Sequence, residues 1–280
     1  MEGTVTQLVV AGNVVLDRTP AGGWVPGGPA LYAARMAHAL GVSVRLVTGL
    51  PAGYDRDVLE GLCLIARPTN RPCRYANSYD AEGNRSQLLL DPGEHLSLST
   101  GDFEGARACL IAPGYHEFES LPAGLPRFVG VSLQGALRST DEAGVVIPHP
   151  QAAARSRSLL RPGAFAFFSE EDAAEPVELA RGIAAEGATA ILTRGYRGAV
   201  LFDAAAERHF PAVPADAIDP TGAGDCFATA FIVRLAETEG DVEEAMRFAL
   251  AAGSLAVERA GLAGVSSRSE VEQRLKQEAA

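Results

Sequence analysis

The sequence predicts an α/β fold, in which a mostly parallel sheet is covered by helices on both faces within a single domain spanning residues 1–280. Short apolar stretches alternate with helical stretches along the chain, and this alternation is typical of parallel strands joined by helical crossovers. A chain of 280 residues with 47% hydrophobic content can bury a full core without disulfides or structural metals. We find no internal repeat, low-complexity tract or linker.

The predicted strands are short apolar runs. Residues 8–15 form a β-branched run interrupted by Gly12 and Asn13, which suits a buried strand better than an amphipathic helix. The other predicted strands span residues 43–49, 108–112, 127–133, 164–168 and 190–193.

The predicted helices are marked by composition and by their end signals. An Ala-rich stretch at residues 30–40 ends at Gly41, a typical C-terminal cap. A last helix begins after Ser267, whose spacing to Glu270 is that of a capping box. The remaining predicted helices span residues 150–160, 171–186, 225–239 and 242–260.

Two segments break the alternation and predict a small β lid, at about residues 18–27 and 70–92. Between residues 72 and 92, polar and apolar side chains alternate around a turn at residues 81–84, which is typical of a β-hairpin. The other segment is rich in Gly and Pro and holds the only tryptophan, Trp24. Together they are expected to cover one end of the main sheet.

Charge and lysine content exclude several functions. The chain has 35 acidic and 24 basic residues, a net charge of −11 and no basic run, which argues against nucleic acid as a partner. One of the basic residues is a lysine, Lys276, and the rest are arginines. A Walker A loop needs a lysine beside its last glycine, and Schiff-base chemistry needs one in a pocket. Lys276 lies in a charged terminal segment, so both mechanisms are excluded.

The cysteines and the apolar runs predict the cellular compartment of the protein. The four cysteines form no CxxC pair and no zinc spacing, which favours free thiols in a reducing compartment. The first 16 residues have no basic region before their apolar run, unlike a signal peptide. No apolar stretch approaches the roughly 20 residues that span a bilayer. We expect a cytoplasmic protein with no membrane partner, either a monomer or a homodimer in which the hairpin forms a clasp.

The segment most informative about chemistry is residues 219–225, Asp-Pro-Thr-Gly-Ala-Gly-Asp, which directly precedes an apolar run. A helix N-terminus exposes unpaired N–H groups, and glycines let an anion approach them closely. Gly222, Ala223 and Gly224 therefore predict a phosphate or oxyanion cradle. Asp225 falls in the first helical turn, where the helix dipole favours a carboxylate able to accept a proton from a substrate hydroxyl. The alternative is that Asp225 is a helix cap and the glycines form a tight turn.

This segment resembles the second signature of the ribokinase-like (PfkB) carbohydrate kinase family, DTxGAGD, and departs from it only at Pro220. The first signature, GG followed by an Ala-rich helix ending in LG, is similar to residues 27–41. Residues 193–198 resemble the TxGxxG nucleotide-binding turn, and residues 12–17 resemble the opening strand whose Asp holds substrate hydroxyls. The resemblance covers nearly the whole chain and implies a Rossmann-type three-layer fold.

The resemblance implies a role for each matching residue. Asp225 would be the catalytic base, and the amides of Gly222, Ala223 and Gly224 would hold charge on the transferred phosphoryl group. The acceptor pocket would include Asp17, Asn13, Gly27, Gly28 and Tyr32, and the nucleotide would bind at Thr193, Gly195, Gly198 and Thr221. Phosphoryl transfer depends mostly on positioning and electrostatics, so it does not require a Walker lysine.

The chain departs from the family where Mg²⁺ is organised through water. The family's NxxE motif is matched by Ser169-Glu170-Glu171-Asp172. Asp172, with Ser169 acting through a water, is therefore the expected Mg²⁺ site, since hard oxygen ligands are retained. The alternative for Ser169 is that it caps the following helix. The resemblance also implies a monovalent cation near Asp219, and Tyr32 stands where the family often has an Asn that contacts the sugar.

Residues 130–138, Gly-Val-Ser-Leu-Gln-Gly-Ala-Leu-Arg, follow a predicted strand at the end where open α/β sheets bind ligands. They are similar to the D-x-Q-G-x-x-R block of the inositol-kinase-like branch, with Ser132 in place of the Asp. Gln134 and Arg138 are therefore expected in the acceptor pocket, with Arg138 steadying a phosphate or the acceptor. The alternative is a solvated arginine at a strand end.

The resemblance implies a phosphotransferase with an alcohol group as acceptor. The expected reaction is transfer of the γ-phosphoryl group of ATP to a hydroxyl of a small sugar or cyclitol, similar to myo-inositol, with Mg²⁺ and a monovalent cation as cofactors. One alternative is a nucleoside kinase of the same family, which an aromatic pocket around Trp24 and Tyr32 would favour. Another is a non-catalytic ligand-binding or sensor protein, which the altered Mg²⁺ motif would favour.

Overall fold

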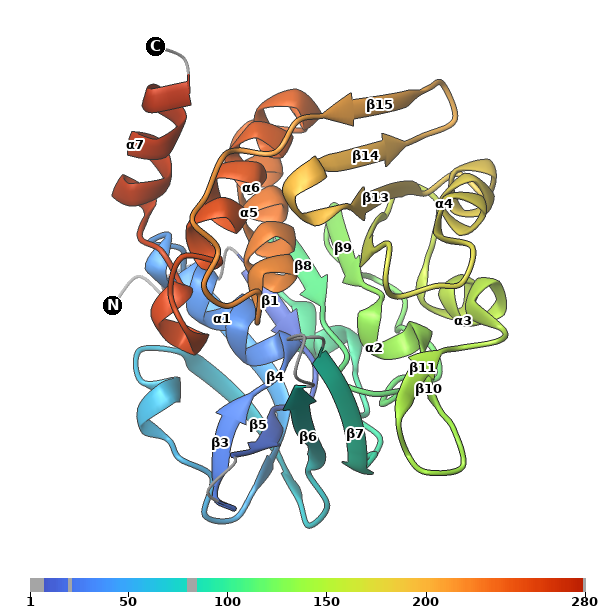
Figure 1. Cartoon of the computed structure of the whole chain (residues 1–280), viewed down its shortest axis with the longest axis vertical. Coiled ribbons are helices and arrows are strands. Elements are labelled where there is room, and N and C mark those ends of the chain that lie inside the picture. The colour runs from blue at the N-terminus through green and yellow to red at the C-terminus, as the bar shows by residue number, and fades with distance from the viewer. Residues whose placement is uncertain (1–7, 20–21, 80–84, 279–280) are drawn as a thin grey trace.

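A nine-stranded sheet forms the centre of the molecule in a computed structural model that describes residues 8–19, 22–79 and 85–278 (Figure 1). Its strand order is β15-β14-β13-β12-β9-β8-β1-β4-β5. Neighbours from β13 to β5 pair in parallel, whereas β14 and β15 join the β13 edge in antiparallel pairing. The strands are β1 (Leu8–Ala11), β4 (Val44–Pro51), β5 (Cys63–Thr69), β8 (Ala108–Ile111), β9 (Phe128–Ser132), β12 (Phe165–Ser169), β13 (Thr189–Thr193), β14 (Ala199–Phe202) and β15 (Glu207–Phe210).

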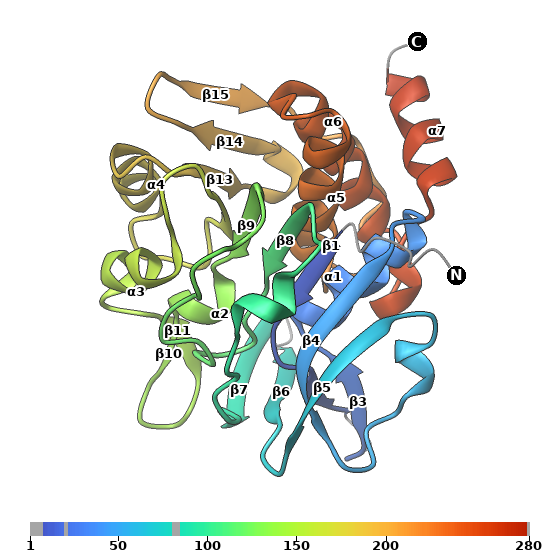
Figure 2. The ribbon, with the colours of Figure 1, turned by 180° about the vertical axis from the view of Figure 1, so that it is seen from behind.

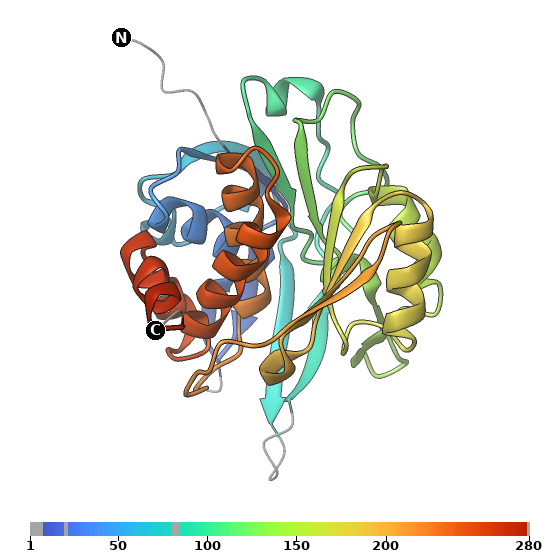
Figure 3. The same cartoon turned by 90° about the horizontal axis from the view of Figure 1, so that it is seen from above.

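Helices cover both faces of this sheet and make three layers, which confirms the predicted fold class (Figures 2 and 3). Helices α1 (Pro29–Ala39), α5 (Ala223–Glu237) and α6 (Val242–Ala256) cover one face, with α7 (Arg268–Glu278) packed outside α6. Helices α3 (Ala152–Leu159) and α4 (Pro176–Ala185) cover the other, and α2 (Gln134–Leu137) is a single turn after β9. Alternate residues of β1 serve the two layers, since Leu8 and Val10 pack toward α1 and α5 whereas Val9 packs on the opposite face.

Several helix-capping signals that were predicted from the sequence are present in the structure. Gly41 follows α1 with a φ of 75°, a left-handed conformation that glycine adopts readily. At the start of α7 the Ser267 N–H donates to Glu270 Oε2 over 2.8 Å, and the Glu270 N–H donates to Ser267 Oγ over 3.4 Å, so the predicted capping box is confirmed. Four 3₁₀ turns complete the helical elements of the described residues: Asp57–Leu59, Thr100–Phe103, Gly195–Arg197 and Gly261–Gly264.

A second sheet of four strands lies across the carboxyl ends of the parallel strands (Figure 1). Its order is β3-β2-β6-β7, from β2 (Val15–Arg18), β3 (Trp24–Gly27), β6 (Cys73–Tyr79) and β7 (Arg85–Asp91). The antiparallel pairing of β6 with β7 is the predicted hairpin, although its turn at residues 81–84 lies outside the described residues. A short ribbon of β10 (Arg138–Thr140) and β11 (Val146–Pro148) lies beside β7.

The structure corrects three predicted boundaries. The strand expected over residues 8–15 is divided, because the chain leaves the main sheet at Gly12 and enters the second sheet at Val15. A Cβ on Gly12 would lie 2.1 Å from the Ala112 carbonyl oxygen, so the crossing passes too close to β8 for a side chain. The helix expected over 171–186 begins only at Pro176, and the one expected over 242–260 ends at Ala256. Strands β5, β14 and β15 were not predicted.

No helix in the described part of the chain combines the length and the apolar character that a transmembrane span requires.

Candidate active site

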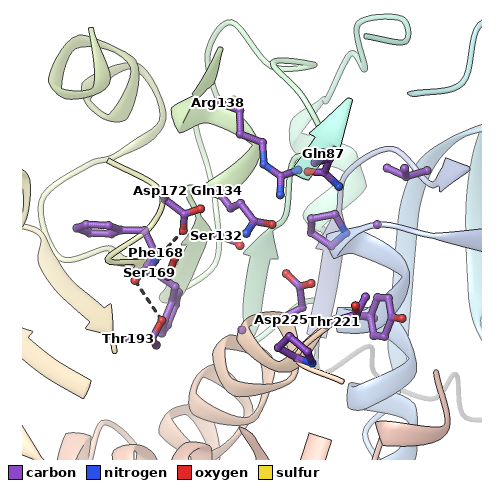
Figure 4. A pocket seen from close by; sticks show the side chains of 18 of the residues that line it. Gln87, Ser132, Gln134, Arg138, Phe168, Ser169, Asp172, Thr193, Thr221 and Asp225 are labelled. Carbon is purple, nitrogen blue, oxygen red and sulfur yellow. Dashed lines mark hydrogen bonds between the residues drawn. The ribbon is translucent and has the colours of Figure 1, made fainter. Parts of the chain in front are cut away.

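A cavity of about 140 Å³ opens at the carboxyl ends of β9, β12 and β13, where α5 begins and the second sheet covers it (Figure 4). Twelve of the residues predicted to form the site line it: Asp17, Gly28, Tyr32, Gln134, Arg138, Ser169, Asp172, Thr193, Thr221, Gly222, Gly224 and Asp225. The fold therefore gathers residues that are up to 208 positions apart in the chain, from Asp17 to Asp225, around one space. Ala223, Asn13, Gly27, Gly195, Gly198 and Asp219 lie outside its lining.

The start of α5 forms one wall of the cavity. Gly222 is the N-cap, in a left-handed conformation with a φ of 78°, and Ala223 is the first helical residue. The Ala223 N–H donates to the Pro220 carbonyl over 3.2 Å and so closes the preceding turn. Within the described residues, the first-turn N–H groups of Gly224 and Asp225 have no hydrogen-bond partner. Of the predicted amides, that of Ala223 therefore bonds within the turn, whereas that of Gly224 remains open toward a ligand.

Asp225 has a carboxyl pKa that burial raises from 3.8 to about 7. The nearby Arg138 guanidinium lowers this pKa, and the nearby Asp172 carboxylate raises it. Burial therefore outweighs the helix dipole, which on its own would lower this pKa. A carboxyl group with a pKa close to neutral matches the requirement for a general base.

Arg138 supplies a positive charge to the cavity lining. Its guanidinium carbon lies 5.3 Å from the centre of the Tyr75 ring, a cation–π arrangement. No carboxylate of the described residues lies within ion-pair distance of Arg138, although Asp172 and Asp225 are both close enough to interact with it electrostatically. Figure 4 shows the guanidinium pointing into the space between these two carboxylates and Gln87. The alternative of a solvated arginine at a strand end is therefore wrong.

Asp172 and Ser169 form a tight turn after β12. The Ser169 N–H donates to Asp172 Oδ2 over 2.7 Å, and the Asp172 N–H donates to the Ser169 carbonyl over 3.1 Å (Figure 4). These bonds hold the chain in a turn until α4 begins at Pro176, so Ser169 does not cap that helix. Asp172 retains one carboxylate oxygen toward the cavity, and Thr193 lines the same wall. This set of hard oxygens fits Mg²⁺, which usually binds one or two carboxylates and keeps several waters.

Tyr32 forms the wall between the second sheet and α5. A Cβ on Gly222 would lie 2.2 Å from the Tyr32 ring, so glycine is needed there for packing as well as for its positive φ. Burial raises the pKa of the Tyr32 hydroxyl, and the Asp219 and Asp225 carboxylates raise it further. Opposite this ring, a Cβ on Gly27 would meet Asp17 Oδ2 at 2.3 Å. Gly27 therefore shapes the cavity by leaving room for Asp17.

Two other predicted residues, Asn13 and Asp219, form hydrogen bonds with the backbone and do not line the cavity. Asn13 donates from Nδ2 to the Glu94 carbonyl and accepts the Gly49 N–H at Oδ1, over 2.8 and 2.9 Å. Asp219 accepts the N–H groups of Thr221 and Gly261, each over 2.9 Å, and so shapes the loop before α5.

The predicted nucleotide turn leads from β13 into β14. Gly195 starts its 3₁₀ turn, and Gly198 follows with a φ of 86°, where a Cβ would lie 2.0 Å from the Phe210 carbonyl oxygen. Glycine at this position therefore brings β14 close to the end of β15 and leaves Thr193 at the cavity wall.

Gln87 and Tyr75 were missed in the sequence. Both line the cavity from the second sheet, and the Gln87 Nε2 donates to Asn77 Oδ1 over 3.0 Å. Only the alternation of polar and apolar residues in the hairpin gave a signal, and it does not say which face of the hairpin covers the cavity. Trp24 is the opposite case, because it lines a separate cavity between the second sheet and the segments that follow β4 and β5.

The α/β layers, the Gly-flanked helix start and the carboxylate beside it define a protein of the ribokinase fold, and comparison with known proteins agrees. The family described as pfkB family carbohydrate kinase matches residues 76–268, more than half of the chain. The chain therefore belongs to the pfkB family of carbohydrate kinases. Ribokinase of Bacillus subtilis (strain 168) is 39% identical over 98 residues, which are 35% of this chain and 33% of that protein. The match thus spans about a third of this curated relative.

Solved structures match over almost the whole chain. Arabidopsis thaliana ribokinase, solved with ribose and ATP, has a TM-score of 0.71 and 20% identity, covering 98% of this chain and 99% of its own. A pyrophosphate-dependent kinase of the ribokinase family, solved with a pyrophosphate analog and myo-inositol, has a TM-score of 0.68 and 18% identity, covering 95% and 99%. At these identities the likeness establishes the fold.

Proposed function

We propose that the protein is a kinase that transfers the γ-phosphoryl group of ATP to a hydroxyl of a small sugar or cyclitol. The observation that carries this proposal is the placement of Asp225 in one cavity with the open N–H groups at the start of α5 and the Arg138 guanidinium. A hydroxyl nucleophile needs a proton acceptor, and a migrating phosphoryl group needs donors that hold its charge. The cavity supplies both.

In the proposed reaction the acceptor lies between Asp17, Tyr32 and Gln134, with one hydroxyl against Asp225. The Asp225 carboxylate accepts the hydroxyl proton as the new O–P bond forms. The bond from the γ-phosphorus to the bridging oxygen breaks, and ADP leaves with that oxygen. The N–H groups of Gly224 and Asp225 and the guanidinium of Arg138 hold the charge on the group in transit.

The donor is proposed to bind along Thr193 and Thr221, above the turn that contains Gly195 and Gly198. Asp172, and Ser169 through a water, would hold Mg²⁺, which neutralises phosphate charge when bound. The loop shaped by Asp219 is the proposed monovalent-cation site, which a comparison of K⁺ with Na⁺ in the assay tests.

A cyclitol is the acceptor that we favour. The 132–138 segment places Gln134 and Arg138 at the cavity, and this segment is similar to that of the inositol-kinase-like branch. The pyrophosphate-dependent relative was solved with myo-inositol. The nucleoside alternative loses support because Trp24 lies outside the cavity. Its ring packs against Arg74, with 5.1 Å from the ring centre to the guanidinium carbon. Strand β3 therefore contributes no aromatic ring that could hold a base together with Tyr32. The sensor alternative loses support because Asp172 keeps a carboxylate oxygen at the cavity.

The test is a panel of sugars, cyclitols and nucleosides, incubated with Mg²⁺ and either ATP or pyrophosphate, with phosphorylated product measured by mass spectrometry. We expect transfer from ATP to at least one cyclitol or sugar, and loss of at least about 10²-fold of the turnover in Asp225→Asn. Asp216→Asn, an exposed carboxylate in the loop before α5, serves as the matched control and keeps wild-type turnover. Tight binding of a panel member without transfer would instead support a sensor, and Asp225→Asn turning over within a few-fold of wild type would exclude Asp225 as the base.

A further inference from the structure

The loop that follows β8 touches three parts of the molecule that carry cavity residues, yet none of its own residues lines the cavity. Strands β8 and β1 are neighbours where the strand order changes direction, with β4 and β5 on one side and β9, β12 and β13 on the other. The 114–117 loop, residues Gly114 to Glu117, therefore leaves the sheet beside the crossing from β1 to β2. Open α/β sheets bind their ligands at such a point.

Glu117 is the buried carboxylate of this loop, with 3% of its surface exposed. Its Oε1 accepts the N–H groups of Asn13 and Gly114, and its Oε2 accepts that of Tyr115, each over 2.8 Å. A buried carboxylate is tolerated when its oxygens are satisfied in this way. The bond to Asn13 fixes the chain where it passes from the main sheet to β2, four residues before Asp17.

Gly114 and His116 extend the contacts of the loop to Arg138. The Gly114 carbonyl accepts the hydroxyl of Tyr75 over 2.9 Å, and the ring of Tyr75 carries the Arg138 guanidinium. The His116 Nδ1 accepts from Arg155, so its Nε2 carries the proton and donates to the Arg138 carbonyl over 2.6 Å. Both the side chain and the backbone of Arg138 are therefore held from this loop.

Backbone strain is an independent sign that the loop is constrained. His116 has a φ of 51°, a left-handed conformation that non-glycine residues rarely adopt. Such a conformation persists where surrounding bonds over-determine it, and it occurs often at functional sites. Here the bonds of Glu117 on one side and of the His116 ring on the other fix the loop in that shape.

We propose that Glu117 is a positioning residue, which through the 114–117 loop sets the places of Asp17 and Arg138 around the acceptor. This proposal rests on the proposed function for the identity of the acceptor, but the bonds that carry it are independent of that function. The donor wall at Thr193 is outside this set of contacts. Loss of Glu117 is therefore expected to act on the acceptor and on phosphoryl transfer more than on the donor.

The decisive variant is Glu117→Gln, which keeps the side-chain shape but turns an N–H₂ group toward backbone donors. We expect the acceptor KM to rise at least about tenfold and kcat to fall by a similar factor, since small misplacements of reacting groups have effects of this size. The ATP KM is expected to stay within about twofold. Glu119→Gln, an exposed neighbour, is the matched control and keeps wild-type constants.

Hydrogen exchange supplies a readout that does not need activity. In Glu117→Gln the amides of Asn13 and Tyr115 are expected to exchange at least about tenfold faster, while those of β13 keep their rates. Unchanged exchange with unchanged acceptor KM would overturn the positioning role. Absence of transfer by the wild type to every acceptor would overturn the proposed function, and the exchange measurement would still test the loop.

A milder variant keeps the proposal testable if Glu117→Gln melts below the assay temperature. His116→Gly accepts the positive φ without strain and removes the ring, with its bonds to the Arg138 carbonyl and to Arg155, while the bonds of Glu117 remain. A rise in acceptor KM with an ATP KM within about twofold supports the proposal. An equal rise of both constants, or no change in either, contradicts it.

Discussion

Replacing Asp225 by Asn is expected to stabilise the folded protein while it removes the proposed base. Burial raises the pKa of this carboxyl from 3.8 to about 7, so the folded chain holds the proton more tightly than the unfolded chain. The ionised carboxylate therefore destabilises the fold progressively as the pH rises from about 4 to about 7, and by a constant amount above that range. Asn has no charge and escapes this effect.

The size of the gain follows from the shift. A difference of roughly three pKa units corresponds to about 4 kcal/mol at most, since one unit is about 1.4 kcal/mol. The side chain is partly exposed to the cavity, and solvent screening there reduces the cost of its charge. The attraction of Arg138 is already contained in the pKa of about 7. We expect a net gain of about 1–2 kcal/mol at pH 8, within the range usual for stabilised functional sites.

The assay is urea unfolding of the wild type, Asp225→Asn and Asp216→Asn at pH 5 and pH 8. The advantage of Asp225→Asn over the wild type should be larger at pH 8 than at pH 5, and Asp216→Asn should follow the wild type at both. An Asp225→Asn protein that is no more stable than the wild type at pH 8, or whose advantage shrinks as the pH rises, would show that burial does not penalise the Asp225 carboxylate.

Three further predictions concern the walls of the cavity. Gly222→Ala places a Cβ against the Tyr32 ring at a residue with a left-handed conformation, and should lower the free energy of unfolding in urea by about 2–4 kcal/mol. Gly224→Ala, whose Cβ meets nothing within 4 Å, should unfold like the wild type. Equal stabilities of the two variants would contradict the packing of Gly222 against Tyr32. Arg138→Ala should lower kcat by about 10²-fold with little change in melting temperature, and a kcat near that of the wild type would remove Arg138 from the phosphoryl path. Asp172→Asn should raise the Mg²⁺ concentration for half-maximal activity by about tenfold or more, and an unchanged Mg²⁺ titration would place the metal elsewhere.

The sequence predicted the layers well, because their signals are local. The apolar runs of the central strands and the end signals at Gly41 and Ser267 depend on neighbours within a few residues. The division of residues 8–15 could not be predicted in this way. It depends on how closely Gly12 passes the Ala112 carbonyl, a contact between residues 100 positions apart.

The candidate site was predictable where it lies in a continuous segment and was missed where it is assembled in three dimensions. Residues 219–225 could be interpreted from the sequence because glycines directly before an apolar helix commonly bind an anion at the helix N-terminus. Gln87 faces the cavity only because of the register of β7 on β6. The role of Glu117 could not be predicted, because one of the three N–H groups that it accepts belongs to Asn13, 104 residues earlier. The raised pKa of Asp225 likewise depends on burial that no short segment encodes.

The lone lysine has a practical consequence that follows from its place in the fold. Lys276 lies on α7, which packs outside α6, two layers away from the sheet (Figures 1 and 3). Amine-reactive dyes, tethers and cross-linkers therefore have one side-chain target, and it lies on the outer side of the helical layer rather than at the carboxyl ends of the strands. Coupling through the Lys276 side chain would attach the protein by α7 and leave the cavity open to solution.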